Sequence, residues 1–308
     1  MCDIWKDNKN VKRLTPSDIE GLLSALKKFN TREVVMSGGE ALLHPNFFRF
    51  CEILKTLNIK VTLLSTGLTL NQNAKQLLQW VNNIIVSLDG QEEIHDFVRN
   101  LPGAFRKIWE SVRVLKSIKP EYKITGRTVI QRLNYRHWPS IIESAMKMGL
   151  DQISFLPADV SSHAFNRKVL WDSSWQNVIL PAREELPELL EIIEGIIYKH
   201  SDAFRKHFIA ETPEKLKNIY LYYAAFYDLN PFPFKKCNAP WVSAVIEADG
   251  NVRPCFFHEA LGQIRENSLD KILNSEKGIQ FRTDLDVNTD PVCRKCVCYL
   301  NLPPWQNP

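Results

Sequence analysis

Five short apolar segments alternate with helical patterns through the first half of this 308-residue chain. The segments are rich in β-branched residues, which favours strands, and the patterns between them repeat apolar residues at helical spacing. The predicted strands are residues 33–36, 60–64, 83–88, 122–130 and 152–156. The predicted helices are residues 16–30, 46–57, 73–81, 103–118 and 140–148. Strands joined by helices form right-handed βαβ units, so the pattern predicts a parallel sheet closed or partly closed into a barrel.

Polar side chains and glycines follow several of these strands. In such barrels the chemistry gathers where strands end and loops begin. The most informative loop carries Gly38, Gly39 and Glu40 directly after an apolar run. Bare glycine backbone lets a ligand approach closely, and the carboxylate would face a positive group. An ordinary strand-to-helix turn also needs glycine, so the two glycines alone leave both interpretations open.

The rest of the chain changes character twice. Helical patterns dominate the middle, including residues 187–198 and 213–227, with no clear strand. From Pro231 the chain is rich in proline and cysteine, and a short hairpin is expected, with strands at residues 242–247 and 251–253. We therefore predict a barrel over residues 1–160, a helical linker or cover over 161–230, and a cysteine-rich domain over 231–308.

Five of the seven cysteines lie in that last part. The predicted hairpin brings Cys237 and Cys255 together, and Cys293, Cys296 and Cys298 form a tight C-x2-C-x-C group. Two separated thiolates plus a close set supply four ligands to one centre, which suits either tetrahedral zinc or an iron-sulfur cluster. Which thiol of the last two is the fourth ligand stays open. Metal is favoured over free thiols because a small loop-rich segment needs a staple, and the cytoplasm keeps thiols reduced.

Composition argues against several kinds of partner. The net charge is +4, and no dense basic run with interleaved aromatics suggests nucleic acid. No apolar segment is long enough to span a membrane, and residues 1–6 lack the apolar region of a signal peptide. We therefore expect a cytoplasmic protein that binds neither nucleic acid nor membrane.

Taken in order, the motifs resemble those of radical S-adenosylmethionine (SAM) enzymes with a C-terminal SPASM or twitch domain. Residues 1–6 resemble the end of the family's C-x3-C-x2-C loop, with Cys2 as the third cysteine, and residues 37–40 resemble its glycine-glycine-glutamate motif. Residues 87–90, followed by His95-Asp96, Arg99 and residues 103–105, also match such members. The C-x12-G-x4-C spacing from Cys237 to Cys255 and the later cysteines resemble the C-terminal extension.

The resemblance implies a partial TIM barrel, (β/α)6, and a [4Fe-4S] cluster on three loop cysteines whose free iron chelates SAM. Reduction of that cluster cleaves SAM to a 5′-deoxyadenosyl radical, which abstracts hydrogen from a substrate. In this chain the residues that match contacts to the methionine amino group are Gly38, Gly39 and Glu40. Thr66 and Ser87 are expected to contact the ribose or carboxylate, and Arg127 the methionine carboxylate if its side chain points inward.

This chain differs from the family pattern in two ways that affect which clusters we expect it to hold. The sequence starts one residue before Cys2, so the first two cluster cysteines and the barrel's first strand are missing. We expect a misplaced start, because the downstream motif is intact; a chain that truly lost these cysteines would be inactive. The C-terminal cysteines are also too few for a full SPASM set. We therefore expect one auxiliary [4Fe-4S] cluster, with Cys237, Cys255, Cys293 and either Cys296 or Cys298 as ligands.

Two functions remain as hypotheses. The leading one is a radical SAM oxidoreductase or maturase acting on a peptide or a small metabolite, with an electron donor such as flavodoxin or ferredoxin. The alternative is a catalytically degenerate barrel that keeps a metal knuckle and serves as a binding or scaffold protein. The intact Gly38-Gly39-Glu40 loop favours the first, and the missing cysteines favour the second.

Overall fold

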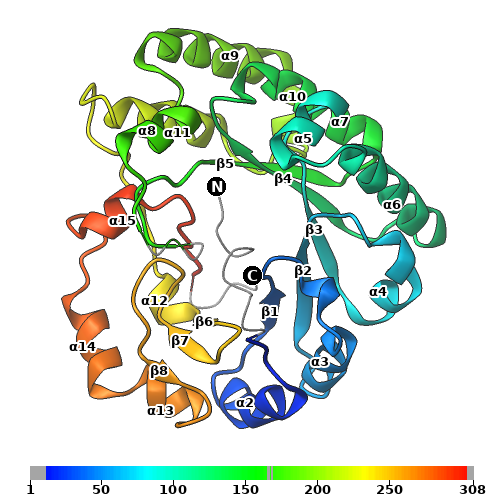
Figure 1. Cartoon of the computed structure of the whole chain (residues 1–308), viewed down its shortest axis with the longest axis vertical. Coiled ribbons are helices and arrows are strands. Elements are labelled where there is room, and N and C mark those ends of the chain that lie inside the picture. Colours follow the sequence, from blue (N-terminus) through cyan, green and yellow to red (C-terminus); the bar gives the residue numbers. More distant parts are fainter. Residues whose placement is uncertain (1–11, 165–166, 168, 304–308) are drawn as a thin grey trace.

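The computed structural model describes residues 12–164, 167 and 169–303. A parallel five-stranded sheet in the order β1-β2-β3-β4-β5 forms its first half. Its strands are β1 (Glu33–Met36), β2 (Lys60–Ser65), β3 (Asn83–Ser87), β4 (Ile124–Ile130) and β5 (Gln152–Pro157). Strands that follow one another in the chain are neighbours, and Figure 1 shows the sheet curving around the centre with helices outside it. The predicted partial barrel is confirmed.

The outer helices start and stop at ordinary signals. In α2, Thr15 and Asp18 form a capping box and Pro16 occupies the first turn. Helix α7 ends at Gly149 in the left-handed region. Helix α5 was not predicted, because it is rich in acidic residues and His95 is the buried residue that it contributes. The helices are α2 (Pro16–Lys28), α3 (Phe47–Lys55), α4 (Ala74–Trp80), α5 (Glu92–Arg99), α6 (Ala104–Ile118) and α7 (Trp138–Met148).

Strand β4 shows which side chains face the inside of the barrel. Its alternate residues Ile124, Gly126, Thr128 and Ile130 are buried, as expected for the face packed against the helices. The residues between them are only half-buried, as expected for the open lumen. Arg127 belongs to this second set, so it lies on the lumen face.

The middle of the chain is helical, as expected, and adds one contact to the edge of the sheet. Its helices are α8 (Ser173–Ile179), α9 (Leu186–Lys199), α10 (Ser201–Arg205) and α11 (Pro213–Ala225). Between the last two, Ile209 forms a parallel bridge with Ile153 of β5. As expected, the described residues of this part contain no strand, and this single bridge leaves no periodic pattern in the sequence. No helix among the described residues is long and apolar enough to cross a membrane.

The C-terminal region folds around a small antiparallel sheet of β6 (Val245–Ile246), β7 (Asn251–Arg253) and β8 (Gly262–Gln263). The hairpin is shorter than predicted, because Val242 ends helix α12 (Ala239–Val242), and β8 was not predicted. Gly250 turns the hairpin with a φ of +91°, and a Cβ there would collide with the Gln263 side chain. Three short helices follow: α13 (Leu269–Leu273), α14 (Glu276–Asp284) and α15 (Pro291–Lys295).

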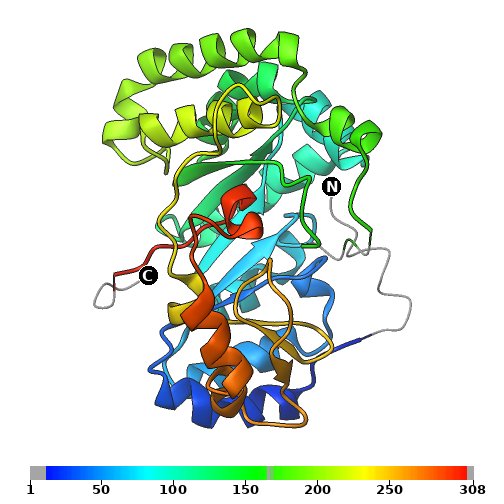
Figure 2. The same ribbon diagram turned by 90° about the vertical axis from the view of Figure 1, so that its left-hand side faces the viewer.

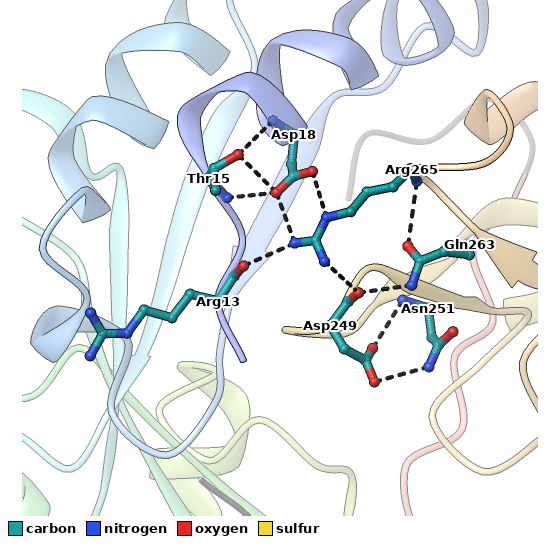
Figure 3. A network of polar contacts seen from close by, with 7 residues as sticks. All are labelled: Arg13, Thr15, Asp18, Asp249, Asn251, Gln263 and Arg265. Carbon is teal, nitrogen blue, oxygen red and sulfur yellow. Dashed lines mark hydrogen bonds and ion pairs between the residues drawn. The ribbon is translucent and has the colours of Figure 1, made fainter. Parts of the chain in front are cut away.

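This C-terminal region fills the side of the ring that the sheet leaves open between β1 and β5 (Figures 1 and 2). Figure 3 shows its attachment to the start of α2, where the Arg265 guanidinium donates to both carboxylate oxygens of Asp18, each at 3.0 Å. The same guanidinium donates to the backbone oxygens of Arg13 and Asp249 at 3.0 and 3.1 Å. Hydrogen bonding to Arg265 lowers the pKa of Asp18 to about 2. We call this contact the Asp18–Arg265 clasp.

Candidate active site and auxiliary metal centre

The Gly38-Gly39-Glu40 loop is fixed by its carboxylate. Glu40 Oε2 accepts from the Thr66 backbone N–H at 2.8 Å, from the Thr66 hydroxyl at 2.5 Å and from the Ser65 hydroxyl at 3.0 Å. Gly38 has a φ of +142°, and a Cβ there would meet nothing within 4 Å. Both glycines are exposed. The carboxylate therefore anchors the loop to the end of β2, and the groups left open to a ligand are the backbone atoms of the glycines.

Beside this loop, strand register brings the other predicted SAM contacts to one level. Ser87 of β3 pairs with Arg127 of β4, which pairs with Ser154 of β5. Because Ser65 pairs with Val86, Thr66 reaches the same level at the end of β2. The Arg127 Nε donates to the Ser154 hydroxyl at 3.1 Å. Three hydroxyls and one guanidinium thus cross the sheet as a polar row, which suits a ligand that carries hydroxyls and a carboxylate.

The residues that follow β3 hold the loop at the end of this strand in place. Asp89 is buried and pairs with Arg99 at 2.5 Å. His95 is also buried, and its Nδ1 accepts from the Asp89 backbone N–H at 3.1 Å. Burial lowers the pKa of His95 to about 4, so its ring is neutral. A Cβ on Gly90 would lie 2.6 Å from the His95 backbone nitrogen, so only glycine lets helix α5 pack this closely.

Sequence reasoning missed Glu211, which lies at the free edge of β5. Its Oε2 accepts from the Phe155 backbone N–H at 3.0 Å, where a neighbouring strand would otherwise supply the acceptor. Burial raises the pKa of Glu211 to about 7, although the Phe155 amide and Arg127 lower it. No local signal could have revealed this residue, because its surroundings come from strands far away in the sequence.

Glu211 is expected to make stability fall as the pH rises. The folded chain holds this proton up to about pH 7, whereas the unfolded chain releases it near the ordinary value of 4.5. Between these values the folded state binds more protons, so rising pH destabilises it by about 3 kcal/mol in total. Urea unfolding of the parent, Glu211→Gln and Glu214→Gln measures how the free energy of unfolding changes across this pH range. Glu211→Gln should lose the fall in stability with rising pH, while Glu214→Gln, which replaces an exposed carboxylate, should keep it. Identical slopes in all three proteins would contradict the raised pKa.

Four cysteines of the C-terminal region affect one another's pKa. Burial raises the pKa of the Cys293 thiol, and Asp290, Cys255 and Cys296 raise it further. Burial also raises the pKa of Cys255, with an added contribution from Cys237. These effects support our proposal that Cys237, Cys255 and Cys293 bind one centre together with a fourth thiol.

Metal-binding side chains other than cysteine also lie in this region. Among the described residues, the metal-binding atoms that lie within 4.8 Å of one another in a group of three or more belong to His258, Asp290 and Cys293.

Cys298 lies beside Cys296: its backbone N–H donates to the Cys296 sulfur at 3.4 Å, and its thiol raises the pKa of Cys296. The surrounding protein raises the pKa of Cys298 itself to about 11, and the charged groups that affect it are Arg127 and Asp159, both at the barrel. Cys296 in turn affects the pKa of Cys293. We therefore propose Cys296 rather than Cys298 as the fourth ligand. Cys2, the predicted ligand of the first cluster, lies outside the described residues.

Comparison with known proteins agrees with this arrangement. The model of the radical SAM superfamily matches residues 1–145, and the model of the SPASM iron-sulfur cluster-binding domain matches residues 237–297. A cysteine-type anaerobic sulfatase-maturating enzyme of Clostridium novyi is 26% identical over 95% of this chain and 79% of its own length. The subtilosin biosynthesis protein AlbA of Bacillus subtilis is 25% identical over 78% of this chain and 48% of its own length.

Among solved structures, native anSMEcpe with bound AdoMet superposes with a TM-score of 0.64 at 18% identity, covering 96% of this chain and 84% of that one. At this identity the superposition bears on the fold, which it reproduces across both the barrel and the C-terminal region. The chain therefore belongs to the radical SAM superfamily, and it is an enzyme that joins a radical SAM barrel to a C-terminal SPASM domain and uses SAM and iron-sulfur clusters.

Proposed function

We propose that this enzyme is a maturase that modifies a peptide or protein substrate by radical chemistry. The bound cluster and SAM supply a 5′-deoxyadenosyl radical that abstracts hydrogen from the substrate. The single observation that carries the proposal is the polar row beside the anchored Gly38-Gly39-Glu40 loop, because together they offer groups of the right chemistry for the amino, carboxylate and ribose groups of SAM. Within it, we assign the glycine backbone to the methionine amino group and Arg127 to the carboxylate, with Thr66 and Ser87 on the ribose or carboxylate.

A peptide substrate is favoured over a small metabolite by the relatives. The sulfatase-maturating enzyme and SkfB of Bacillus subtilis are named for the maturation of a sulfatase and of the sporulation killing factor, and AlbA for the biosynthesis of the bacteriocin subtilosin; each matches more than three quarters of this chain. An external reductant such as flavodoxin or ferredoxin completes the proposed system.

The test is formation of 5′-deoxyadenosine. The chain, with the upstream cysteines of its C-x3-C-x2-C loop restored, is reconstituted anaerobically with iron and sulfide, reduced with dithionite and supplied with SAM, with and without a library of synthetic peptides. We expect 5′-deoxyadenosine and a mass change in a subset of the peptides. No 5′-deoxyadenosine under any condition would overturn the proposal and favour the scaffold alternative, whereas product without any modified peptide would overturn the substrate class.

Replacing Arg127 should weaken SAM binding while leaving the chain folded. Loss of a charge-assisted hydrogen bond costs about 1.5–3 kcal/mol, so Arg127→Ala should raise the KM for SAM on the order of 10- to 100-fold. The matched control is Arg132→Ala, which removes a half-exposed arginine paired with Glu185 on the outer surface. An unchanged KM in Arg127→Ala would remove this residue from the SAM site.

A further inference from the structure

The turn that follows Cys255 surrounds the auxiliary centre with hydrogen-bond donors. The backbone amides of Phe257 and His258 both face the Cys255 thiol and lower its pKa, against the larger effect of burial. The turn itself is held by Arg253, which donates to the His258 carbonyl oxygen at 2.8 Å. Backbone donors thus already serve one thiol of the centre, and the side chain of the same turn is free to serve another.

The His258 ring is fixed against a second thiol. Its Nε2 lies 3.4 Å from the Cys293 sulfur, within hydrogen-bond range for sulfur. Only 11% of the side chain is exposed, and the ring packs edge-on against Phe281 with centroids 4.9 Å apart. The packing holds the ring in one orientation, with Nε2 toward the Cys293 sulfur.

Asp290 is the other acceptor within reach, and its geometry is poorer. Its Oδ1 lies 3.9 Å from His258 Nε2, beyond hydrogen-bond distance. That oxygen already accepts from the backbone amides of Val292 and Cys293, at 3.0 and 2.7 Å. Asp290 therefore caps helix α15, and the Cys293 sulfur is the acceptor that the imidazole can reach.

We propose that His258 donates an N–H···S hydrogen bond to Cys293 when that thiolate is bound to the auxiliary cluster, and that this bond raises the reduction potential of the cluster. The inference rests on the proposed ligand set of Cys237, Cys255, Cys293 and Cys296. Reduction adds negative charge that spreads onto the ligand sulfurs, so a donor to one of them stabilises the reduced state. His258 is thus a positioning residue that favours this cluster as an electron acceptor.

The test uses the full chain carrying Cys2→Ala, so that only the auxiliary centre contributes a signal. We compare this parent protein with His258→Phe, His258→Gln and Phe281→Leu after anaerobic reconstitution. The measurements are iron analysis and a potentiometric titration followed by electron paramagnetic resonance. His258→Phe should keep its iron and titrate at lower potential. His258→Gln restores an N–H donor and should recover much of the shift. Phe281→Leu removes the ring that orients the imidazole, so it should move the potential part of the way toward that of His258→Phe.

Three outcomes would overturn the proposal. An unchanged potential in a fully loaded His258→Phe protein would show that the imidazole does not tune the cluster. Loss of iron in both His258 variants would make His258 a ligand rather than a donor. A parent protein without auxiliary iron would overturn the ligand set. The measurement needs neither SAM nor substrate, so its result is separate from that of the 5′-deoxyadenosine assay.

Discussion

Cys296→Ala should abolish the auxiliary cluster, whereas Cys298→Ala should leave it intact. We propose that four thiolates hold the auxiliary [4Fe-4S] cluster, so in a Cys2→Ala background the difference is roughly four irons per chain. The reason for choosing Cys296 is that its thiol affects the pKa of Cys293, whereas Arg127 and Asp159 at the barrel affect that of Cys298. Iron and sulfide analysis with visible absorption measures the difference.

The matched control for this pair is Cys51→Ala. Cys51 is fully buried in the hydrophobic core beside the barrel helices, so its loss should leave the iron content unchanged even where it lowers stability. The reverse result, in which Cys298→Ala loses the iron and Cys296→Ala keeps it, would show that the lumen-facing thiol is the ligand.

Glu40→Gln should weaken SAM binding without unfolding the barrel. The amide keeps one acceptor oxygen but turns an NH2 group toward donors that the carboxylate now satisfies, chiefly the Thr66 N–H and the Ser65 hydroxyl. A hydrogen bond to a charged group contributes about 1.5–3 kcal/mol, so releasing the loop should reduce SAM affinity on the order of 10- to 100-fold. Equilibrium binding of SAM to the reconstituted protein measures the effect.

The control is Glu52→Gln, which removes a half-exposed carboxylate paired with Arg49 on the outer face of α3. It should bind SAM as the parent does. Thermal unfolding of both variants shows whether each chain is still folded. If Glu40→Gln bound SAM with parental affinity, the carboxylate would not be what holds the glycines in place.

The barrel could be predicted from the sequence because the signals for its strands and helices are local. Each strand and most helices carry their own periodicity, and caps such as Thr15 with Asp18 mark where a helix begins. Helix α5 was missed because it is only eight residues long and its apolar residues are few, and β8 was missed because two residues acquire a strand conformation only by pairing with β7. These elements depend on contacts that are distant in the sequence.

Part of the candidate site could also be predicted, because some of its signals are local in the sequence. Gly38, Gly39 and Glu40 form a continuous motif, and strand alternation limited Arg127 to two faces, of which the burial pattern identified one. The choice between Cys296 and Cys298 needed a side-chain direction that spacing does not contain. Glu211 and His258 gain their character from Phe155 and Cys293, which lie 56 and 35 residues away.

The Asp18–Arg265 clasp also bears on how the chain is made. Its two residues lie 247 positions apart, so the ribosome, at about 5–20 residues per second, delivers Arg265 roughly 12–50 s after Asp18. Throughout that interval α2 packs against α3 without the Arg265 contact, and the ring stays open between β1 and β5. Chaperones and cluster-delivery factors therefore meet an accessible lumen during synthesis, and the arrival of the last domain closes it.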